Sequence, residues 1–470
     1  MSTPGPSPLM SGERHLSVDE ARAAILAPLR PVAGVEVLPL AQALGRVLAE
    51  DLICPMDVPP HDNSAMDGYA FDGALLGAGD AALELALVGT ALAGAAPLAA
   101  RPATAAAPSA SPSPVGAAVP AAGAPRPRCV RVTTGAVMPP GLDTVVPQEL
   151  VMLRGDGVAA VVAVPAGTVR RGENRRKAGE DLTCGQVAIA RGRVLRPSDL
   201  GLAASLGCVT LAVRRRVRVA LVSTGDELRN PGEPLPAGCI YDSNRASLAA
   251  ALQRLGVEVV DCGLVPDDPQ ALEAVFADAA ARCDAVVTSG GVSVGEADHT
   301  RAMLARLGEV AFWKVAMRPG RPFAFGPLRR AGDGGAAARP GADVQPLDRS
   351  AAEPAWLFAL PGNPVAALVT FYAFVRDALR VLAGADASPP MALRVRSAAA
   401  IRKRPGRTEF QRAIVERDGA GQWVARLTGA QGAGILRSLS EANALLVLPH
   451  EQGSVAAGDP VEVWLFDGLV

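Results

Sequence analysis

The chain has 470 residues, of which 49% are hydrophobic and 20% are charged, and its formal net charge is −1. This balance is typical of a folded globular protein, and the length predicts roughly three domains. No clustered basic excess indicates a nucleic-acid surface, and no apolar run approaches the ~20 residues of a membrane-spanning helix. Seven scattered cysteines disfavour disulfide and zinc frameworks, and the N-terminus lacks a secretory signal pattern. We therefore expect a cytoplasmic protein that binds neither nucleic acid nor membrane.

The N-terminal part of the chain predicts two helices. Ser17 can cap the first helix, residues 17–29, and Glu20 stands at the third position of a capping box. A second helical pattern covers residues 40–50. The run that follows, 55–70, is rich in Asp, Asn, Ser and Gly, and it is equally consistent with a solvated loop and with the edge of a site.

Beyond this run, the sequence predicts a small β-rich module that is interrupted by a low-complexity insertion. Residues 91–128 are almost entirely Ala, Pro, Ser and Gly, so they cannot bury enough apolar surface to offset the entropy of ordering. Residues 170–181, RRGENRRKAGED, hold five basic residues in their first eight positions and predict a solvated turn or an anion-facing patch. Strands are expected at 129–134, 143–146 and 158–164, and a helix at 197–206.

From Val217 onward, strand and helix patterns alternate over roughly 160 residues, which predicts a mostly parallel sheet with helices on both faces. Asp268 is expected to cap a helix that begins with Pro269. A second Ala/Gly-rich loop, 330–352, interrupts the pattern, and the tail from Met391 predicts a separate C-terminal β domain. The expected strands of the α/β part are 217–223, 257–265, 285–287 and 356–360, with a hairpin-like pair at 309–317 and 322–325.

Polar segments directly follow the four predicted strands of this part: Ser223–Glu227, Asp267-Asp268, Ser289–Asp298 and Pro361–Pro364. Because the carboxyl ends of parallel strands meet at one edge of a sheet, we expect these segments to form one ligand site. Helix N-termini supply N–H donors, the carboxylates suit a metal ion, and Lys314 and Arg318 add positive charge. The sequence has no P-loop, G-x-G-x-x-G or G-x-S-x-G motif, so these residues predict only a phosphorylated, metal-chelated small-molecule ligand.

Seven motifs occur in order along nearly the whole chain outside the two insertions: DNSAMDGYA (62–70), VTTGAVMPPG (132–141), STGDEL (223–228), YDSN (241–244), SGGVSVGEADHT (289–300), FWKVAMRPGRPFAFG (312–326) and LPGNPV (360–365). Together they resemble the molybdopterin molybdenumtransferase family, which includes bacterial MoeA and the gephyrin E domain. Any one of these motifs would be weak, but seven in order are specific.

The resemblance implies insertion of molybdenum from molybdate into adenylyl-molybdopterin, with release of AMP. This is the final step of molybdenum cofactor biosynthesis, and it makes the protein a transferase. The resemblance also implies Mg²⁺ as a cofactor and a homodimer whose active cleft is shared between subunits. The molybdopterin adenylyltransferase and molybdoenzyme chaperones are the expected protein partners.

The implied fold class is multidomain α/β plus β. It has a doubly wound α/β molybdopterin-binding domain, a small β-rich module, an elongated linker domain and a C-terminal β domain. The expected boundaries are a disordered N-terminus at 1–12, an elongated N-terminal domain at 13–57 and 165–214, a β-rich domain at 58–164, the α/β domain at 215–388 and the C-terminal domain at 389–470.

The matching motifs carry the family's functional residues onto this chain. The resemblance implies catalytic roles for Asp67, Thr134, Asp181, Glu227, Asp267, Asp298, Lys314, Arg318 and Arg412. It implies cofactor binding by Thr224, Gly225, Asp242, Ser243, Asn244, Ser289, Gly290, Gly291, Ser293, Gly295, Pro361, Gly362, Asn363 and Pro364. Glu227 and Asp298 are the expected Mg²⁺ ligands, because a carboxylate can hold Mg²⁺ against a pyrophosphate.

Three positions depart from the family pattern. Arg318 stands where the family often has Lys, and Ala366 and Ala433 stand where it often has Ser. We associate these positions with the oxyanion side of the site. Two lost hydroxyls remove hydrogen-bond donors, at a cost of about 1–3 kcal/mol each, whereas Arg still supplies a positive charge. Weaker molybdate binding, or a preference for tungstate, is the hypothesis that follows.

Two other functions fit parts of the pattern. A hydrolase of nucleotide-linked pterins would cleave the same phosphoanhydride without transferring a metal. A non-catalytic, gephyrin-like scaffold would bind a partner peptide through the C-terminal domain. Because a scaffold needs neither the carboxylates nor Lys314, the sequence favours the catalytic function.

Overall fold

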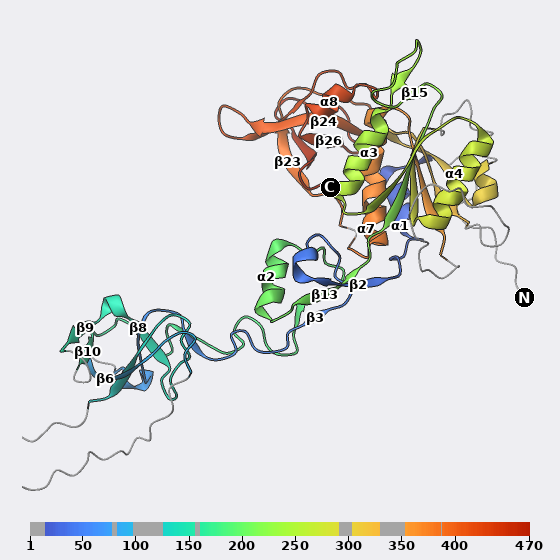
Figure 1. Cartoon of the computed structure of the whole chain (residues 1–470). Coiled ribbons are helices and arrows are strands. Elements are labelled where there is room, and N and C mark those ends of the chain that lie inside the picture. The colour runs from blue at the N-terminus through green and yellow to red at the C-terminus, as the bar shows by residue number, and fades with distance from the viewer. Residues whose placement is uncertain are drawn as a thin grey trace, which may run out of the picture. The chain divides into compact units, whose positions relative to one another are not determined.

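The computed structural model describes residues 15–77, 82–96, 126–155, 160–290, 303–329, 353–386 and 388–470, whose course Figure 1 shows. These residues fall into two compact units. The first unit comprises the described residues of Met1–Glu50, Arg191–Leu200 and Val209–Val470, and the second unit those of Asp51–Ala190 and Gly201–Cys208. Helix α2 (Pro197–Ser205), which the sequence predicts, contains one of these boundaries.

A seven-stranded sheet, in the order β1-β19-β21-β22-β18-β14-β17, forms the centre of the first unit. Strands β22, β18, β14 and β17 run parallel, whereas β21 is antiparallel to both β22 and β19. The predicted, mostly parallel sheet is therefore confirmed, and the predicted hairpin extends it. The strands are β1 (His15–Leu16), β14 (Arg218–Thr224), β17 (Glu258–Val265), β18 (Ala285–Ser289), β19 (Ala311–Val315), β21 (Pro322–Leu328) and β22 (Ala355–Leu360).

Side chains of the parallel strands alternate between two hydrophobic clusters, one on each face of the sheet. In β14, Val219 and Leu221 belong to one cluster and Ala220 and Val222 to the other, and all four are fully buried. This alternation explains why the strand sequence is continuously apolar. Helices α1 (Val18–Leu26), α3 (Ser243–Arg254), α6 (Pro364–Thr370) and α7 (Arg376–Leu382) cover one face, and α4 (Pro269–Arg282) covers the other (Figure 1).

Three helices begin at side chains that cap them. The Ser17 hydroxyl and the Glu20 carboxylate each accept the other residue's backbone N–H, at 3.2 and 2.8 Å, so the predicted capping box is confirmed. Asp268 caps α4, whose first residue is Pro269, as the sequence predicts. Asp242 caps α3.

Helices α6 and α7 are joined by a π-helical turn, Phe371–Val375. Among the described helices, none is both long and apolar enough to cross a membrane.

The C-terminal β domain is a closed barrel. Strands β24, β25, β23, β27 and β26 pair in that order, and β26 pairs back onto β24. A short strand, β20 (Met317–Arg318), pairs in parallel with the start of β24 and joins the barrel to the α/β part. The β domain predicted for the tail is confirmed, and its strands are β23 (Ala392–Ser397), β24 (Thr408–Arg417), β25 (Trp423–Leu427), β26 (Ala444–Leu448) and β27 (Pro460–Leu465).

One predicted helix is wrong. Residues 40–50 contain only a 3-10 turn, Leu40–Gln42. The backbone groups that follow pair with other segments of the chain. For example, the N–H of Gly45, whose φ is +71°, donates to the carbonyl of Leu195 at 2.9 Å. Tertiary pairing therefore overrides the local helical pattern. Nearby, β2 (Val35–Pro39) and β13 (Thr210–Arg214) form an antiparallel ribbon.

The second unit contains a six-stranded sheet in the order β8-β5-β7-β6-β10-β9. Its core includes Phe71, Leu85 and Val162, all fully buried. The strands are β5 (Gly68–Phe71), β6 (Leu83–Ala91), β7 (Arg128–Val132), β8 (Thr144–Pro147), β9 (Met152–Arg154) and β10 (Val161–Val164), of which β7, β8 and β10 were predicted. Two short ribbons pair β3 (Leu52–Ile53) with β12 (Val187–Ile189), and β4 (Asn63–Ser64) with β11 (Arg175–Arg176).

The substitution Phe358→Ala tests the core of the first unit. Phe358 is fully buried in β22, and its ring centroid lies 5.3 Å from that of Phe325. We expect a loss of about 3–5 kcal/mol in the free energy of unfolding, because a buried cavity replaces the ring. Differential scanning calorimetry would show the loss as a lower Tm, with Val209→Ala as control at a position 79% exposed. Equal Tm values for both variants would contradict the assigned core.

Candidate functional site

The carboxyl ends of three neighbouring strands bring the predicted loops to one edge of the sheet. Ser289 of β18 pairs in register with Ser223 of β14 and with Leu360 of β22. Ser223 and Ser289 are buried, and their hydroxyl oxygens lie 3.5 Å apart. The next residues of each chain segment, including Thr224 and Gly290, therefore emerge side by side at this edge.

Gly290 is the tightest point of the edge. Its φ is +94°, and a Cβ there would lie 2.6 Å from the Thr224 carbonyl oxygen and 2.8 Å from the Thr224 hydroxyl. Only glycine fits so close an approach without displacing the backbone. The Thr224 hydroxyl is buried and has no hydrogen-bond partner among the described residues. Because an unpaired buried hydroxyl is destabilising, this favours a bound group that pairs with it.

The first turn of α3 contacts the Pro-Gly-Asn turn that precedes α6. The Asn244 side-chain amide donates to the Gly362 carbonyl at 2.7 Å. Asp242, which is 2% exposed, caps α3 by accepting the Arg245 N–H at 3.0 Å. The structure therefore places the predicted cofactor-binding residues of 242–244 beside those of 361–364.

Two of the predicted carboxylates follow β14 and β17. The Glu227 carboxylate folds over Gly225, where a Cβ would lie 2.6 Å from one of its oxygens. The Asp267 N–H donates to the Asp226 carboxylate at 3.1 Å, which ties the two loops together. Lys314 lies further along the sheet, on β19, which β21 separates from β22.

A pocket of about 380 Å³ lies beside this edge, where the Arg318–Arg321 turn and the Pro361–Asn363 turn meet the C-terminal barrel. Arg318, Ala366 and Ala433, the three positions that depart from the family pattern, all line it. Residues far apart in the sequence thus form one surface, as their assignment to a common oxyanion side requires.

Three arginines give the pocket a positive charge. Arg407 is oriented by Glu409, whose carboxylate accepts the Arg407 Nε at 2.9 Å, and Gln411 donates to the other carboxylate oxygen at 2.9 Å. The guanidinium groups of Arg318 and Arg321 make no hydrogen bond or ion pair with another described residue. Guanidinium groups bind planar and tetrahedral oxyanions through paired hydrogen bonds, so this charge suits an oxyanion.

Arg412 lies behind the pocket rather than in its lining. It is 1% exposed, and its guanidinium donates to the carbonyl oxygens of Ala430 and Gly432 at 3.3 and 3.1 Å. Burial, followed by repulsion from Arg318, lowers the pKa of Arg412 to about 10. These contacts hold the turn that carries Ala433, so Arg412 positions the pocket wall. Direct contact with substrate stays a prediction.

The sequence analysis did not single out Arg407, although one signal pointed to it. The tetrapeptide R-P-G-R occurs twice, at 318–321 and 404–407. Its glycines, Gly320 and Gly406, both have positive φ, of +101° and +100°, although the peptide bond before Pro319 is cis and that before Pro405 is not. Each turn delivers an arginine to the pocket, so the repeat has a structural meaning that local patterns do not reveal.

The second unit brings together two predicted catalytic residues. Thr134 donates its N–H and its hydroxyl to the same oxygen of Asp67, at 2.6 and 2.8 Å. These hydrogen bonds, the backbone one first, lower the pKa of Asp67. Asp67 is thus an ionised carboxylate of fixed orientation. The third predicted residue of this unit, Asp181, is exposed, and its N–H donates to the Val58 carbonyl at 3.0 Å.

The basic segment 170–181 forms ion pairs within the second unit. Because these pairs neutralise much of its charge, they favour the solvated turn over the anion-facing patch. The pairs are Arg171–Asp143, Arg175–Asp62 and Arg176–Glu180.

Some predicted residues lie outside the described part of the chain. They include Asp298, the expected second metal ligand, together with Gly291, Ser293 and Gly295 of the glycine loop. The loop 330–352 also lies outside it. The roles assigned to these residues stay predictions.

The fold and the pocket define a class of multidomain protein, with an α/β ligand-binding domain and a C-terminal barrel that contributes to the same pocket. Family models match in the same order. They are the MoeA N-terminal region (domains I and II) at residues 16–207, a probable molybdopterin-binding domain at 220–381 and the MoeA C-terminal region (domain IV) at 394–466.

Relatives match along nearly the entire length. The molybdopterin molybdenumtransferase of Haemophilus influenzae is 37% identical, over 97% of this chain and 100% of the relative. The molybdopterin molybdenumtransferase 2 of Mycobacterium tuberculosis is 35% identical, over 95% and 99%. The crystal structure of the molybdopterin biosynthesis MoeA protein of Pyrococcus horikoshii covers 96% of this chain and all of its own, with a TM-score of 0.71 and 25% identity. The chain therefore belongs to the molybdopterin molybdenumtransferase (MoeA) family.

Thr134→Val tests the fixed carboxylate of the second unit. We expect the pKa of Asp67 to rise part of the way toward its ordinary value, because the hydroxyl bond is lost and the backbone bond remains. Since the folded-state pKa is lowered, any stabilisation by ionised Asp67 exists above the unfolded-state pKa and is lost as pH falls through the folded one. A ¹³C NMR titration measures the shift, with Thr90→Val as control. An unchanged Asp67 titration would contradict the assigned contact.

Proposed function

We propose that this protein inserts molybdenum from molybdate into adenylyl-molybdopterin and releases AMP, the final step of molybdenum cofactor biosynthesis. Membership in the molybdopterin molybdenumtransferase family supports this, because the match extends over the α/β domain and the barrel alike. The observation that carries the proposal is the arginine-lined pocket beside the carboxyl edge of the sheet. The pterin ligand and the oxyanion then occupy adjacent places.

The two substrates would bind through different groups. The phosphate of molybdopterin binds at the sheet edge, where the Thr224 hydroxyl and the first turn of α3 offer donors and Gly290 leaves room for the ligand. Molybdate binds in the pocket, between the Arg318–Arg321 turn and Arg407. This arrangement brings the oxyanion close to the adenylylated pterin.

The reaction breaks a phosphoanhydride and needs no protein nucleophile. The residues of the site therefore act by holding the two substrates together and by offsetting their negative charge. Guanidinium groups are suited to this task, because they remain charged at all physiological pH values. Asp67, whose carboxylate is held by Thr134, and Glu227 would orient the substrates.

We propose that Mg²⁺ binds at this site as an ion shared with the substrate. Among the described residues, no group of three His, Cys, Asp or Glu side chains could hold a metal. Mg²⁺ usually binds through one or two carboxylates together with substrate phosphates and water. Glu227, with Asp298 as the expected second ligand, would provide these carboxylates, and the ion would offset phosphate charge.

A direct assay tests the function. Purified protein incubated with adenylyl-molybdopterin and Mg²⁺ is expected to release AMP at a rate that depends on molybdate, and the product should reconstitute a molybdoenzyme that lacks its cofactor. Chelation of Mg²⁺ should reduce the rate. AMP release of equal rate without molybdate would instead identify the nucleotide-pterin hydrolase, and no AMP release with folded protein would favour the scaffold.

Arg318→Ala tests the oxyanion pocket. We expect molybdate to bind about 10–100-fold more weakly, because charge-assisted hydrogen bonds contribute about 1.5–3 kcal/mol. Arg318→Lys should retain part of the affinity, since it keeps the charge. Isothermal titration with molybdate and with tungstate measures both constants, and Ala433→Ser tests whether a hydroxyl restores molybdate preference. Arg402→Ala, at an exposed position outside the pocket lining, is the control. An unchanged affinity in Arg318→Ala would refute the assignment.

We also propose a homodimer with sites shared between subunits. The proposed site residues Asp67 and Thr134 belong to one compact unit and Glu227 to the other. If each site combines the second unit of one subunit with the first unit of its partner, a mixed dimer of Asp67→Ala and Glu227→Ala keeps one intact site. Co-expression of the two inactive variants should therefore restore about a quarter of wild-type activity, because half the dimers are mixed. Co-expression that yields no activity would indicate sites within single subunits.

A further inference from the structure

One excursion of the chain connects two proposed ligand-binding residues. Residues 226–241, which we call the arm, follow β14 and Gly225. Glu227 lies at the start of the arm, and Asp242 directly follows its end. At its base, β15 (Leu228–Arg229) pairs in parallel with β16 (Ile240–Tyr241), and the Asp242 N–H donates to the Arg229 carbonyl at 3.0 Å. The position of the arm therefore determines where both carboxylates lie.

The arm is closed internally by a few polar contacts. The Glu233 carboxylate accepts the Asn230 N–H at 2.9 Å and the Asn230 side-chain amide at 2.7 Å. The Tyr241 hydroxyl donates to the Glu233 carbonyl at 2.9 Å. With its amide group held in this way, the side chain of Asn230 presents its remaining acceptor, Oδ1, at a fixed place.

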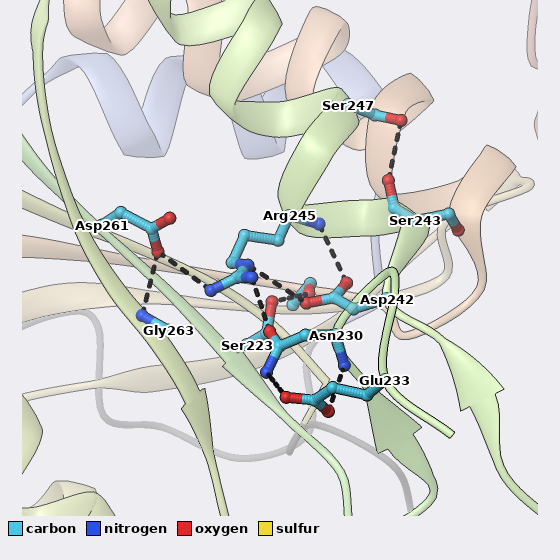
Figure 2. A network of polar contacts seen from close by, with 10 residues as sticks. Ser223, Asn230, Glu233, Asp242, Ser243, Arg245, Ser247, Asp261 and Gly263 are labelled. Atoms are coloured by element: carbon cyan, nitrogen blue, oxygen red, sulfur yellow. Dashed lines mark hydrogen bonds and ion pairs between the residues drawn. The ribbon is translucent and has the colours of Figure 1, made fainter. Parts of the chain in front are cut away.

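Arg245, on the first turn of α3, connects the arm to the rest of the domain. One guanidinium nitrogen donates to Asn230 Oδ1 at 2.7 Å. A second lies 3.5 Å from Asp261 on β17, and Nε lies 3.7 Å from Asp242. Figure 2 shows the guanidinium among these three side chains. A planar group with several donors can serve three partners at once, which an ammonium on a flexible chain cannot do as well.

The contact with Asp242 has an electrostatic reason. The Asp242 side chain is 1% exposed, and its Oδ2 has no hydrogen-bond partner in the part of the chain that the structure describes. A buried carboxylate without a nearby positive charge is strongly unfavourable. The Arg245 guanidinium supplies that charge, so it compensates the buried carboxylate and helps to orient Asp242.

We propose that Arg245 is a positioning residue, which holds the arm with Glu227 and the cap residue Asp242 in the geometry that binds the pterin substrate. This inference rests on the proposed function for its catalytic readout. It assigns Arg245 no contact with the reacting atoms. Its effect is local to the sheet edge, because its described contacts include no residue that lines the arginine pocket.

The substitution Arg245→Gln tests the proposal in the full-length protein. We expect kcat/KM for adenylyl-molybdopterin to fall more than about 30-fold, while the affinity for molybdate alone stays within twofold of wild type. Arg245→Lys should recover part of the activity, since it keeps the charge beside Asp242 but not the bridge. Arg254→Gln, at an exposed position in the last turn of α3, is the matched control.

A double-mutant cycle with Asn230→Ala isolates the bridge. If Arg245 acts through the arm, Arg245→Gln should cause a clearly smaller loss in the Asn230→Ala background than in wild type, and the loss that remains reflects the missing charge beside Asp242. Full additivity, or loss of molybdate affinity equal to the loss of kcat/KM, would overturn the proposal, because it would indicate separate roles or general damage to the fold.

Hydrogen exchange of the unliganded protein gives a readout that does not depend on activity. Amides of residues 226–244 should exchange about tenfold faster in Arg245→Gln than in wild type, whereas those of the barrel should not change. Unchanged exchange in the arm would overturn the proposal. If the wild-type protein shows no transferase activity, the function fails, while faster exchange in the arm would still support the structural role of Arg245.

Discussion

The parallel pairing of β20 with β24 is the contact on which the proposed oxyanion pocket depends. It involves only Met317 and Arg318 on the side of the α/β part, and Met317 is buried in the main hydrophobic cluster. This pairing places the Arg318–Arg321 turn beside the start of the strand that follows Arg407. Backbone and apolar contacts thus set the spacing of arginines whose like charges oppose their approach.

The sheet edge depends on a different constraint, the absence of a side chain at Gly290. Close contact with Thr224 lets the ends of β14 and β18 lie together. It also leaves the buried Thr224 hydroxyl with no partner among the described residues, which lowers stability. Local costs of this kind are typical of ligand sites, where a fold loses some stability by leaving a donor unpaired until the ligand binds. The two places therefore depend on different features. The pocket brings arginine side chains together, whereas the sheet edge depends on the missing side chain of Gly290.

Much of the fold was predictable from local patterns. Continuous apolar runs identified β14, β18 and β22, and Ser17 and Asp268 cap the predicted helices. The helix predicted at 40–50 was wrong, because Gly45 and its neighbours pair with distant segments. The sequence motifs also identified Arg318, Ala366 and Ala433 as departures from the family pattern on the oxyanion side of the site. Their meeting in one pocket, and the presence of Arg407 there, depend on long-range strand pairing that no local pattern encodes.

Both the α/β part and the C-terminal barrel line the pocket, so the pocket is complete only when both have folded. Arg407 precedes β24, and the barrel closes only when β26 and β27, near the C-terminus, have paired. A nascent or truncated chain could assemble its α/β core and still lack the oxyanion site, because domains form as their sequence becomes complete. Oxyanion bound in the proposed pocket would then stabilise only molecules with a closed barrel, which couples ligand retention to the pairing of β26 and β27.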